Sequence, residues 1–151
     1  MVFCCCHIDP NDPFRGKYIT LRFEQESYYS DQIDSLPESG EVFVLLGEDE
    51  NGFAKIEKVQ TEKPDGSQDY MITDIYRKYE NRNLLRLNFP FDRYYMEESK
   101  AYEAELAHRR ARVDSSQKTY ALVMVNEGKT ALEDVILDGV SIKEVVEAVE
   151  D

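Results

Sequence analysis

The sequence predicts an α+β protein, mainly antiparallel β, that forms a single domain over residues 1–151. Short segments with strand patterns recur along the chain, turn residues separate them, and helix-forming residues gather in the C-terminal half. This order lacks the regular alternation of strands and helices that parallel βαβ units require. We therefore expect a small curled sheet or barrel of about eight strands, with one long helix over about 97–112 and a short C-terminal helix.

The N-terminal part predicts two strands that a proline-rich loop connects. Residues 2–8 are apolar and compatible with a strand, and the following loop holds Pro10 and Pro13, which no regular element could cross. Residues 17–24 alternate between apolar and polar side chains, the pattern of a half-buried strand. Residues 25–40 are polar and end in a turn, so we expect a connecting segment with room for one helical turn.

The central part predicts a hairpin and then two more strands. Residues 41–46 and 53–59 flank a loop that contains Asn51 and Gly52, a pair that tolerates the positive φ angles of hairpin turns. Residues 63–67 form a second turn signal. Alternation returns in two segments on either side of a polar break, at residues 70–76 and 84–89.

The C-terminal part predicts the helices and one further hairpin. Residues 97–112 are rich in Ala, Glu, Arg and Leu, with acids first and arginines last, as the helix dipole favours. Residues 118–125 and 130–137 flank a turn and predict a hairpin. Ser141 and Glu144 fit a capping box, so a short terminal helix is expected to follow.

The charge balance excludes one class of partner. The chain has 31 acidic and 18 basic side chains, a formal net charge of -13, with no local stripe of Lys or Arg. Such a surface repels phosphate backbones, so we predict that the protein binds no nucleic acid. No apolar stretch approaches the roughly 18 residues of a membrane span, and no signal peptide is recognisable, so we expect the chain as given to be soluble.

The run from Cys4 to His7 contains the residue types that bind zinc and copper. In a strand each face would offer at most two of these ligands, and the only other histidine is His108. We therefore predict buried thiols rather than a metal site. Asp9 and Asp12 lie in one loop without the spacing of a calcium loop, and turn hydrogen bonds, with Arg15 as an ion-pair partner, explain them. No metal and no cofactor are predicted.

Catalytic patterns are absent from the sequence. Neither histidine has an evident Ser or Cys partner, and the chain contains no nucleophile elbow, Walker loop or dinucleotide-binding glycine run. We therefore predict no catalytic residue. Tyr94 and Tyr95, with Phe89 and Phe91 nearby, form a candidate aromatic patch for a partner or ligand, and core packing is the alternative.

Residues 9–23 combine an Asp-Pro-Asn-Asp stretch, an Arg-Gly pair and a Gly-x-Tyr-x-x-Leu-x-Phe run. This stretch resembles the signature of the GDYXXLXY family of bacterial membrane-anchored proteins. Gly16, Tyr18 and Leu21 match that pattern, whereas Lys17 replaces its Asp and Phe23 its final Tyr. Residues 91–98 resemble the second block of the family, an aromatic pair before an acidic helix start, and residues 136–139 resemble its C-terminal end.

The resemblance implies an N-terminal membrane anchor followed by this domain, often beside a multispanning membrane protein, with no established activity. We therefore expect an extracytoplasmic accessory domain, on the outer face of the inner membrane, that docks on an integral membrane partner. Because Met1 stands immediately before the first predicted strand, the anchor is expected to be absent from this chain. The resemblance leaves the oligomeric state open.

The residues expected to make the contact belong to the two family blocks. They are Asp9, Asp12, Arg15, Gly16, Tyr18, Tyr94, Tyr95 and Glu97. The alternative is an enzyme or a small-ligand-binding domain, in which carboxylates such as Asp9, Asp12 or Glu97 line a cleft with tyrosines. Convergence of these carboxylates and Arg15 on one concave pocket would favour the alternative, and their dispersal over loops would count against it.

Overall fold

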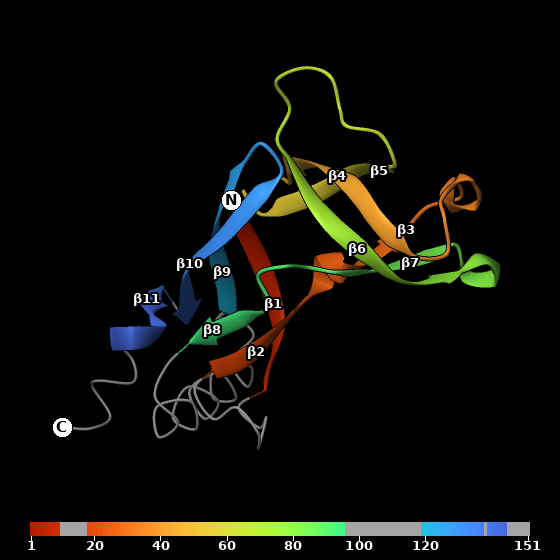
Figure 1. Cartoon of the computed structure of the whole chain (residues 1–151). Coiled ribbons are helices and arrows are strands. Elements are labelled where there is room, and N and C mark those ends of the chain that lie inside the picture. The colour runs from red at the N-terminus through yellow and green to blue at the C-terminus, as the bar shows by residue number, and fades with distance from the viewer. Residues whose placement is uncertain (10–17, 96–118, 138, 145–151) are drawn as a thin grey trace. The chain divides into compact units, whose positions relative to one another are not determined.

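The computed structural model describes residues 1–9, 18–95, 119–137 and 139–144, and its regular structure is almost entirely β (Figure 1). The strands are β1 (Val2–Asp9), β2 (Tyr18–Phe23), β3 (Ser27–Tyr29), β4 (Gly40–Glu48), β5 (Ala54–Gln60), β6 (Tyr70–Tyr79), β7 (Leu84–Asn88), β8 (Arg93–Tyr95), β9 (Thr119–Asn126), β10 (Lys129–Leu137) and β11 (Val140–Ser141). Three 3₁₀ turns are η1 (Glu24–Glu26), η2 (Ile33–Ser35) and η3 (Glu80–Arg82). The paired strands for which a register is defined run antiparallel, so the mainly antiparallel β class is confirmed.

The chain divides into two compact units, which are described separately. The first contains residues 24–90 and the tip of the β9–β10 hairpin, residues 124–131. The second contains residues 2–23 and the described residues from Phe91 onward, apart from that tip.

The first unit is built on a five-stranded sheet in the order β3-β7-β6-β4-β5. Apolar side chains at alternate positions of β4 point to its core, since Val42, Val44 and Leu46 are buried and their neighbours along the strand are not. The sheet curls until it is nearly closed, and the Gln25 side-chain amide donates a hydrogen bond to the carbonyl of Ala54 at 3.1 Å, across from η1 to β5. The predicted hairpin of residues 41–46 and 53–59 is confirmed as β4 and β5.

The second unit is built on a six-stranded sheet in the order β11-β10-β9-β1-β2-β8. Its core contains a cluster of three phenylalanine rings. Phe91 lies 4.8 Å from Phe3 and 5.2 Å from Phe23 between ring centroids, and all three side chains are buried. Tilted and edge-on ring pairs of this kind add to the free energy gained by burying the rings themselves.

The predicted strands at residues 2–8, 17–24, 70–76, 84–89, 118–125 and 130–137 are confirmed, each with small differences in its bounds. The expected number of about eight strands is wrong, because eleven are described. The additional ones, β3, β8 and β11, are two or three residues long, too short for a pattern of alternation to show. The predicted connecting segment at 25–40 therefore contains β3 as well as helical turns.

The long helix predicted over 97–112 lies outside the described residues. Of the predicted C-terminal helix, residues 142–144 are helical and the rest lies outside the described part as well. The described chain thus contains very little helix.

Candidate functional site

The last part of the family block, residues 18–23, forms β2, which lies between β1 and β8 in the six-stranded sheet. The register places Tyr18 opposite Tyr95, and Thr20 opposite both Asp9 and Arg93. The structure therefore brings the backbones of Asp9, Tyr18 and Tyr95 to the same end of three adjacent strands. Two segments that are far apart in the sequence, each expected to make contacts, meet at this end of the sheet, which we call the β1-β2-β8 end.

Tyr94 and Tyr95 point to opposite sides of β8, as neighbours in a strand do. Tyr94 is 7% exposed and Tyr95 is 68% exposed. Burial raises the pKa of the Tyr94 phenol above its ordinary value, and the nearby Asp134 carboxylate adds to this effect, whereas the Lys143 ammonium opposes it. Tyr94 therefore belongs to the core, and Tyr95 is the member of the pair at the surface.

The other family positions of β2 serve the core. Leu21 is completely buried, and its backbone N–H donates a 2.7 Å hydrogen bond to the carbonyl of Asp92, just before β8. Phe23, which replaces the final Tyr of the family pattern, is buried with its ring 6.1 Å from that of Phe3. A phenylalanine suits this position because a tyrosine hydroxyl would need a buried hydrogen-bond partner.

The remaining predicted contact residues, Asp12, Arg15, Gly16 and Glu97, lie outside the described residues. For Asp9 and Tyr18 the strand backbone is described and the side chain is not. The convergence of the predicted carboxylates on one pocket therefore stays a prediction. Among the described residues, no group of three His, Cys, Asp or Glu side chains could hold a metal ion.

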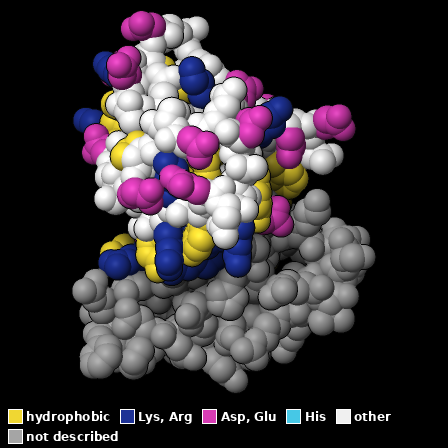
Figure 2. Space-filling model, turned by 90° about the vertical axis from the view of Figure 1, so that its right-hand side faces the viewer, with side chains coloured by type: hydrophobic (Ala, Val, Ile, Leu, Met, Phe, Trp, Pro, Cys, Tyr) yellow, Lys and Arg dark blue, Asp and Glu magenta, His cyan; other side chains and the backbone are white. Residues whose placement is uncertain are grey.

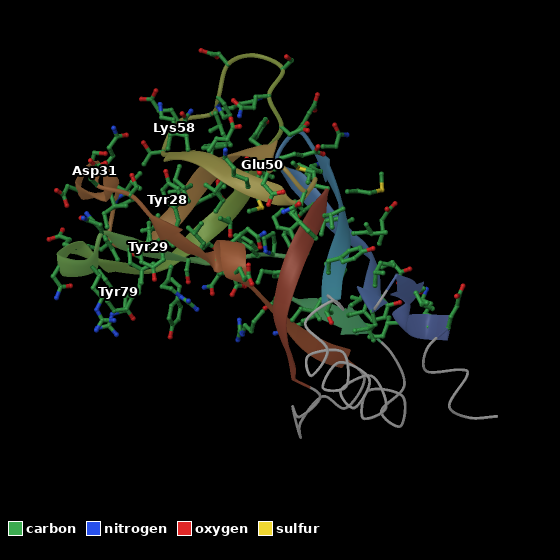
Figure 3. The ribbon with its side chains drawn as sticks, turned by 180° about the vertical axis from the view of Figure 1, so that it is seen from behind. Tyr28, Tyr29, Asp31, Glu50, Lys58 and Tyr79 are labelled. Atoms are coloured by element: carbon green, nitrogen blue, oxygen red, sulfur yellow. The ribbon has the colours of Figure 1, made fainter. Side chains whose placement is uncertain are left out.

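A groove in the first unit lies where the two edges of the five-stranded sheet approach each other, and sequence patterns gave no sign of it. Its volume is about 300 Å³, and it is lined by Glu24, Gln25, Ser27, Tyr28, Asp49, Ala54, Lys55 and Ile56. Tyr28, one of these lining residues, is labelled in Figure 3. The lining residues come from η1, β3, the β4–β5 turn and β5, so only the curling of the sheet assembles them. We call this the seam groove.

One polar atom of a residue that lines the seam groove has no partner. The Gln25 amide nitrogen faces the Ala54 carbonyl, which can only accept, and this fixes the orientation of the amide. The Gln25 Oε1 atom is then a buried acceptor without a hydrogen bond in the described structure. Glu24 and Asp49 also line the groove, and Asp49 Oδ1 accepts hydrogen bonds from the backbone N–H groups of Asn51 and Phe53. The acceptors suit a ligand that supplies N–H or O–H donors.

The fold and the β1-β2-β8 end define a class of protein: a mainly antiparallel β protein in which Tyr18 and Leu21 of the family block lie on a strand that is paired on both sides, beside a strand that carries two tyrosines. The model of the family described as GDYXXLXY protein matches residues 6–135. The chain therefore belongs to the GDYXXLXY protein family, as its sequence blocks indicated.

The other comparisons found no relatives. No curated protein matches the chain, and no solved structure matches it. Within the described ranges, no helix has the length and apolar character needed to cross a membrane.

Proposed function

We propose that this chain is the interaction domain of a membrane-anchored bacterial protein and that it docks on an integral membrane partner at the β1-β2-β8 end. The observation that carries the proposal is the exposure of Tyr95, 68%, at the end of the sheet where the family block also lies. The anchor, the extracytoplasmic location and the membrane partner are what family membership implies, and they are part of the same proposal.

The chemistry of Tyr95 supports a contact role. An exposed tyrosine offers a large rigid apolar ring and a hydroxyl, and tyrosines are enriched among the residues that dominate binding energy at interfaces. The antiparallel pairing of β8 with β2 fixes the backbone of Tyr95, so little backbone entropy is lost when a partner binds. Arg15, in the adjoining family block, is the second position at which we expect contact.

We expect that Tyr95→Ala lowers recovery of the partner about tenfold or more, because losing an aromatic anchor costs about 2 kcal/mol of binding free energy. The thermal midpoint should remain within a few degrees of the parent, because the removed side chain is exposed. The measurement is affinity purification of the tagged full-length protein from solubilised membranes of its own host, with partners quantified by mass spectrometry.

Tyr76→Ala is the matched control, since Tyr76 is 66% exposed and lies on β6 in the other unit. This variant should recover the partner as the parent does. Equal losses in both variants, or a large drop in the thermal midpoint for Tyr95→Ala, would contradict docking at the β1-β2-β8 end. Recovery of no multispanning protein with the parent chain would contradict the proposed function itself.

A second candidate function is binding of a small ligand, which the seam groove and its two acidic lining residues, Glu24 and Asp49, favour. We expect butylammonium to shift the backbone NMR signals of residues 24–28 and 54–56, and Glu24→Gln to weaken these shifts, because the variant removes one of the two groove carboxylates. Glu62→Gln makes the same change in charge at an exposed position outside the groove. Shifts that respond equally to both variants would rule out specific binding in the groove.

A further inference from the structure

The first unit carries a second surface, on the outer face of β3, β7 and β6. Two rows of residues cross these strands in register. One row contains Tyr29, Leu84 and Tyr79, and the next contains Ser27, Arg86 and Arg77. Cross-strand partners share one face of a sheet, so the two rows form a single patch. Arg82, in η3, joins it by placing its guanidinium over the Tyr79 ring. We call this patch the arginine–tyrosine face.

The core residues confirm which side of the sheet this is. Leu85 and Leu87 of β7 are completely or almost completely buried, and they alternate with Leu84 and Arg86 along the strand. The arginine–tyrosine face therefore lies on the side away from the core. Tyr29 is 69% exposed, and Figure 3 shows Tyr29 and Tyr79 at the same end of the unit. Leu84 is buried although it lies on this outer side, in the row between the two tyrosines.

The cations of the face are held in place without carboxylate partners. The Arg77 and Arg82 guanidiniums lie 5.0 and 5.7 Å from the centre of the Tyr79 ring, and Arg86 donates to the Ser27 hydroxyl. Lys78 forms an ion pair with Glu80, whereas within the described part of the chain no acid is paired with Arg77, Arg82 or Arg86. A guanidinium near the face of an aromatic ring is steadied by it and still has N–H groups to donate.

This concentration of positive charge is unusual for a chain with a net charge of -13. In the view of Figure 2, Lys and Arg side chains form a band beside hydrophobic side chains, and other Lys and Arg side chains lie among the acidic ones over the rest of the view. Tyr29 is exposed and Tyr79 is half-buried, and arginines without acidic partners beside such tyrosines are a combination enriched at protein interfaces. The acidic remainder of the surface limits an anionic partner to a short contact.

We propose that the arginine–tyrosine face binds a short, extended, acidic peptide segment of a partner protein, in which Asp or Glu residues flank an apolar one. The carboxylates pair with Arg77, Arg82 and Arg86, and the apolar side chain packs on Tyr29 and Tyr79. This surface belongs to the first unit and is independent of docking at the β1-β2-β8 end.

The spacing of the face fits such a segment. Residues two apart in a strand lie about 7 Å apart and three adjacent strands span about 10 Å, so the two rows match alternate side chains of an extended peptide. Arginine binds carboxylates through two parallel N–H donors, which gives both orientation and specificity. A nucleic acid is disfavoured, because its phosphates would continue beyond the face and meet the acidic surface around it.

The test is titration of the whole chain with a labelled ten-residue peptide of glutamates around two central leucines, followed by fluorescence anisotropy and by NMR. We expect binding that weakens as salt rises, with NMR shifts centred on residues 77–86 and on Tyr29. The double variant Arg77→Gln and Arg82→Gln should raise Kd about tenfold, because it removes two charge-assisted pairs. The same peptide with glutamine in place of glutamate should bind at least about tenfold more weakly than the acidic peptide.

The control is the double variant Lys58→Gln and Lys63→Gln, which removes two exposed positive charges elsewhere in the same unit. This control should change Kd less than about twofold, because it alters the net charge of the protein but removes no group that contacts the peptide. Equal effects of the two double variants, shifts centred elsewhere, or no binding of the peptide would each overturn the proposal.

Two other outcomes would show that something other than an acidic peptide binds the arginine–tyrosine face, and they would also overturn the proposal. One is an oligomer of the parent chain in sedimentation equilibrium that the arginine variant dissociates, which would make the occupant a second copy of this chain. The other is arginine-dependent binding to vesicles of anionic phospholipid without binding of the peptide. An unchanged thermal midpoint of the arginine variant separates loss of binding from loss of fold.

Discussion

Replacing Phe91 with alanine is expected to lower the free energy of unfolding by about 3 to 5 kcal/mol, the range observed when a large buried aromatic side chain is truncated. Phe91 is 4% exposed, and its ring packs against those of Phe3 and Phe23. Close-packed rings cannot collapse fully into the space that is left, so a cavity adds to the lost burial. Urea unfolding followed by circular dichroism measures the change.

Tyr76→Ala provides the comparison for this prediction, because it truncates an aromatic side chain that is 66% exposed. It should change the free energy of unfolding by less than about 0.5 kcal/mol. If Phe91→Ala lowers the free energy of unfolding no more than Tyr76→Ala does, the three phenylalanine rings do not form a packed core. Because Phe3, Phe23 and Phe91 come from three distant segments, the result also tests whether those segments meet.

Substituting alanine for Gly128 is expected to destabilise the protein by about 2 to 4 kcal/mol, for two separate reasons. Gly128 has a φ of +83°, which disfavours a residue with a Cβ atom. A Cβ there would also lie 2.8 Å from Ile72 Cδ1 and 2.9 Å from Tyr70 Cε2. The backbone cannot easily move away, since the Gly128 carbonyl accepts a 3.0 Å hydrogen bond from the N–H of Ile72.

Gly52→Ala separates the two causes. Gly52 has the same φ of +83° in the β4–β5 turn, but a Cβ there would meet no atom within 4 Å. Gly52→Ala should therefore lower the free energy of unfolding by about 1 to 2 kcal/mol, through the unfavourable backbone conformation alone. The difference between the two variants in thermal or urea unfolding therefore measures the contact with β6. Equal losses of unfolding free energy in Gly128→Ala and Gly52→Ala would show that the hairpin tip does not pack closely on Tyr70 and Ile72.

Local chemistry was enough to locate most strands. Alternation in residues 17–24 and 84–89 marks strands because side chains of a strand point to opposite faces and one face is buried. Asn51 and Gly52 located the turn between β4 and β5 because glycine adopts positive φ at little cost. Strands of two or three residues gave no such pattern, and β3, β8 and β11 form only because longer strands pair with them.

The candidate sites depended more on tertiary structure. The family blocks could be recognised in the sequence, and so could Tyr94 and Tyr95 as a pair of interest. Which of the two faces outward depends on the strand that they form, because β8 buries Tyr94 and exposes Tyr95. The cysteine run likewise predicts at most two metal ligands on each face of β1, but its environment depends on the strands that pair with β1.

The sequence by itself determined the mainly antiparallel β class, the longer strands, the family and the acidic character of the chain, because these follow from local periodicity, turn residues and composition. Only the tertiary structure decided that η1 and β5 form a seam groove and that Arg77, Arg82 and Arg86 share one face with Tyr29 and Tyr79. Both features join residues from separate strands, and strand order, register and curvature are set by long-range pairing and burial, which a single segment does not encode.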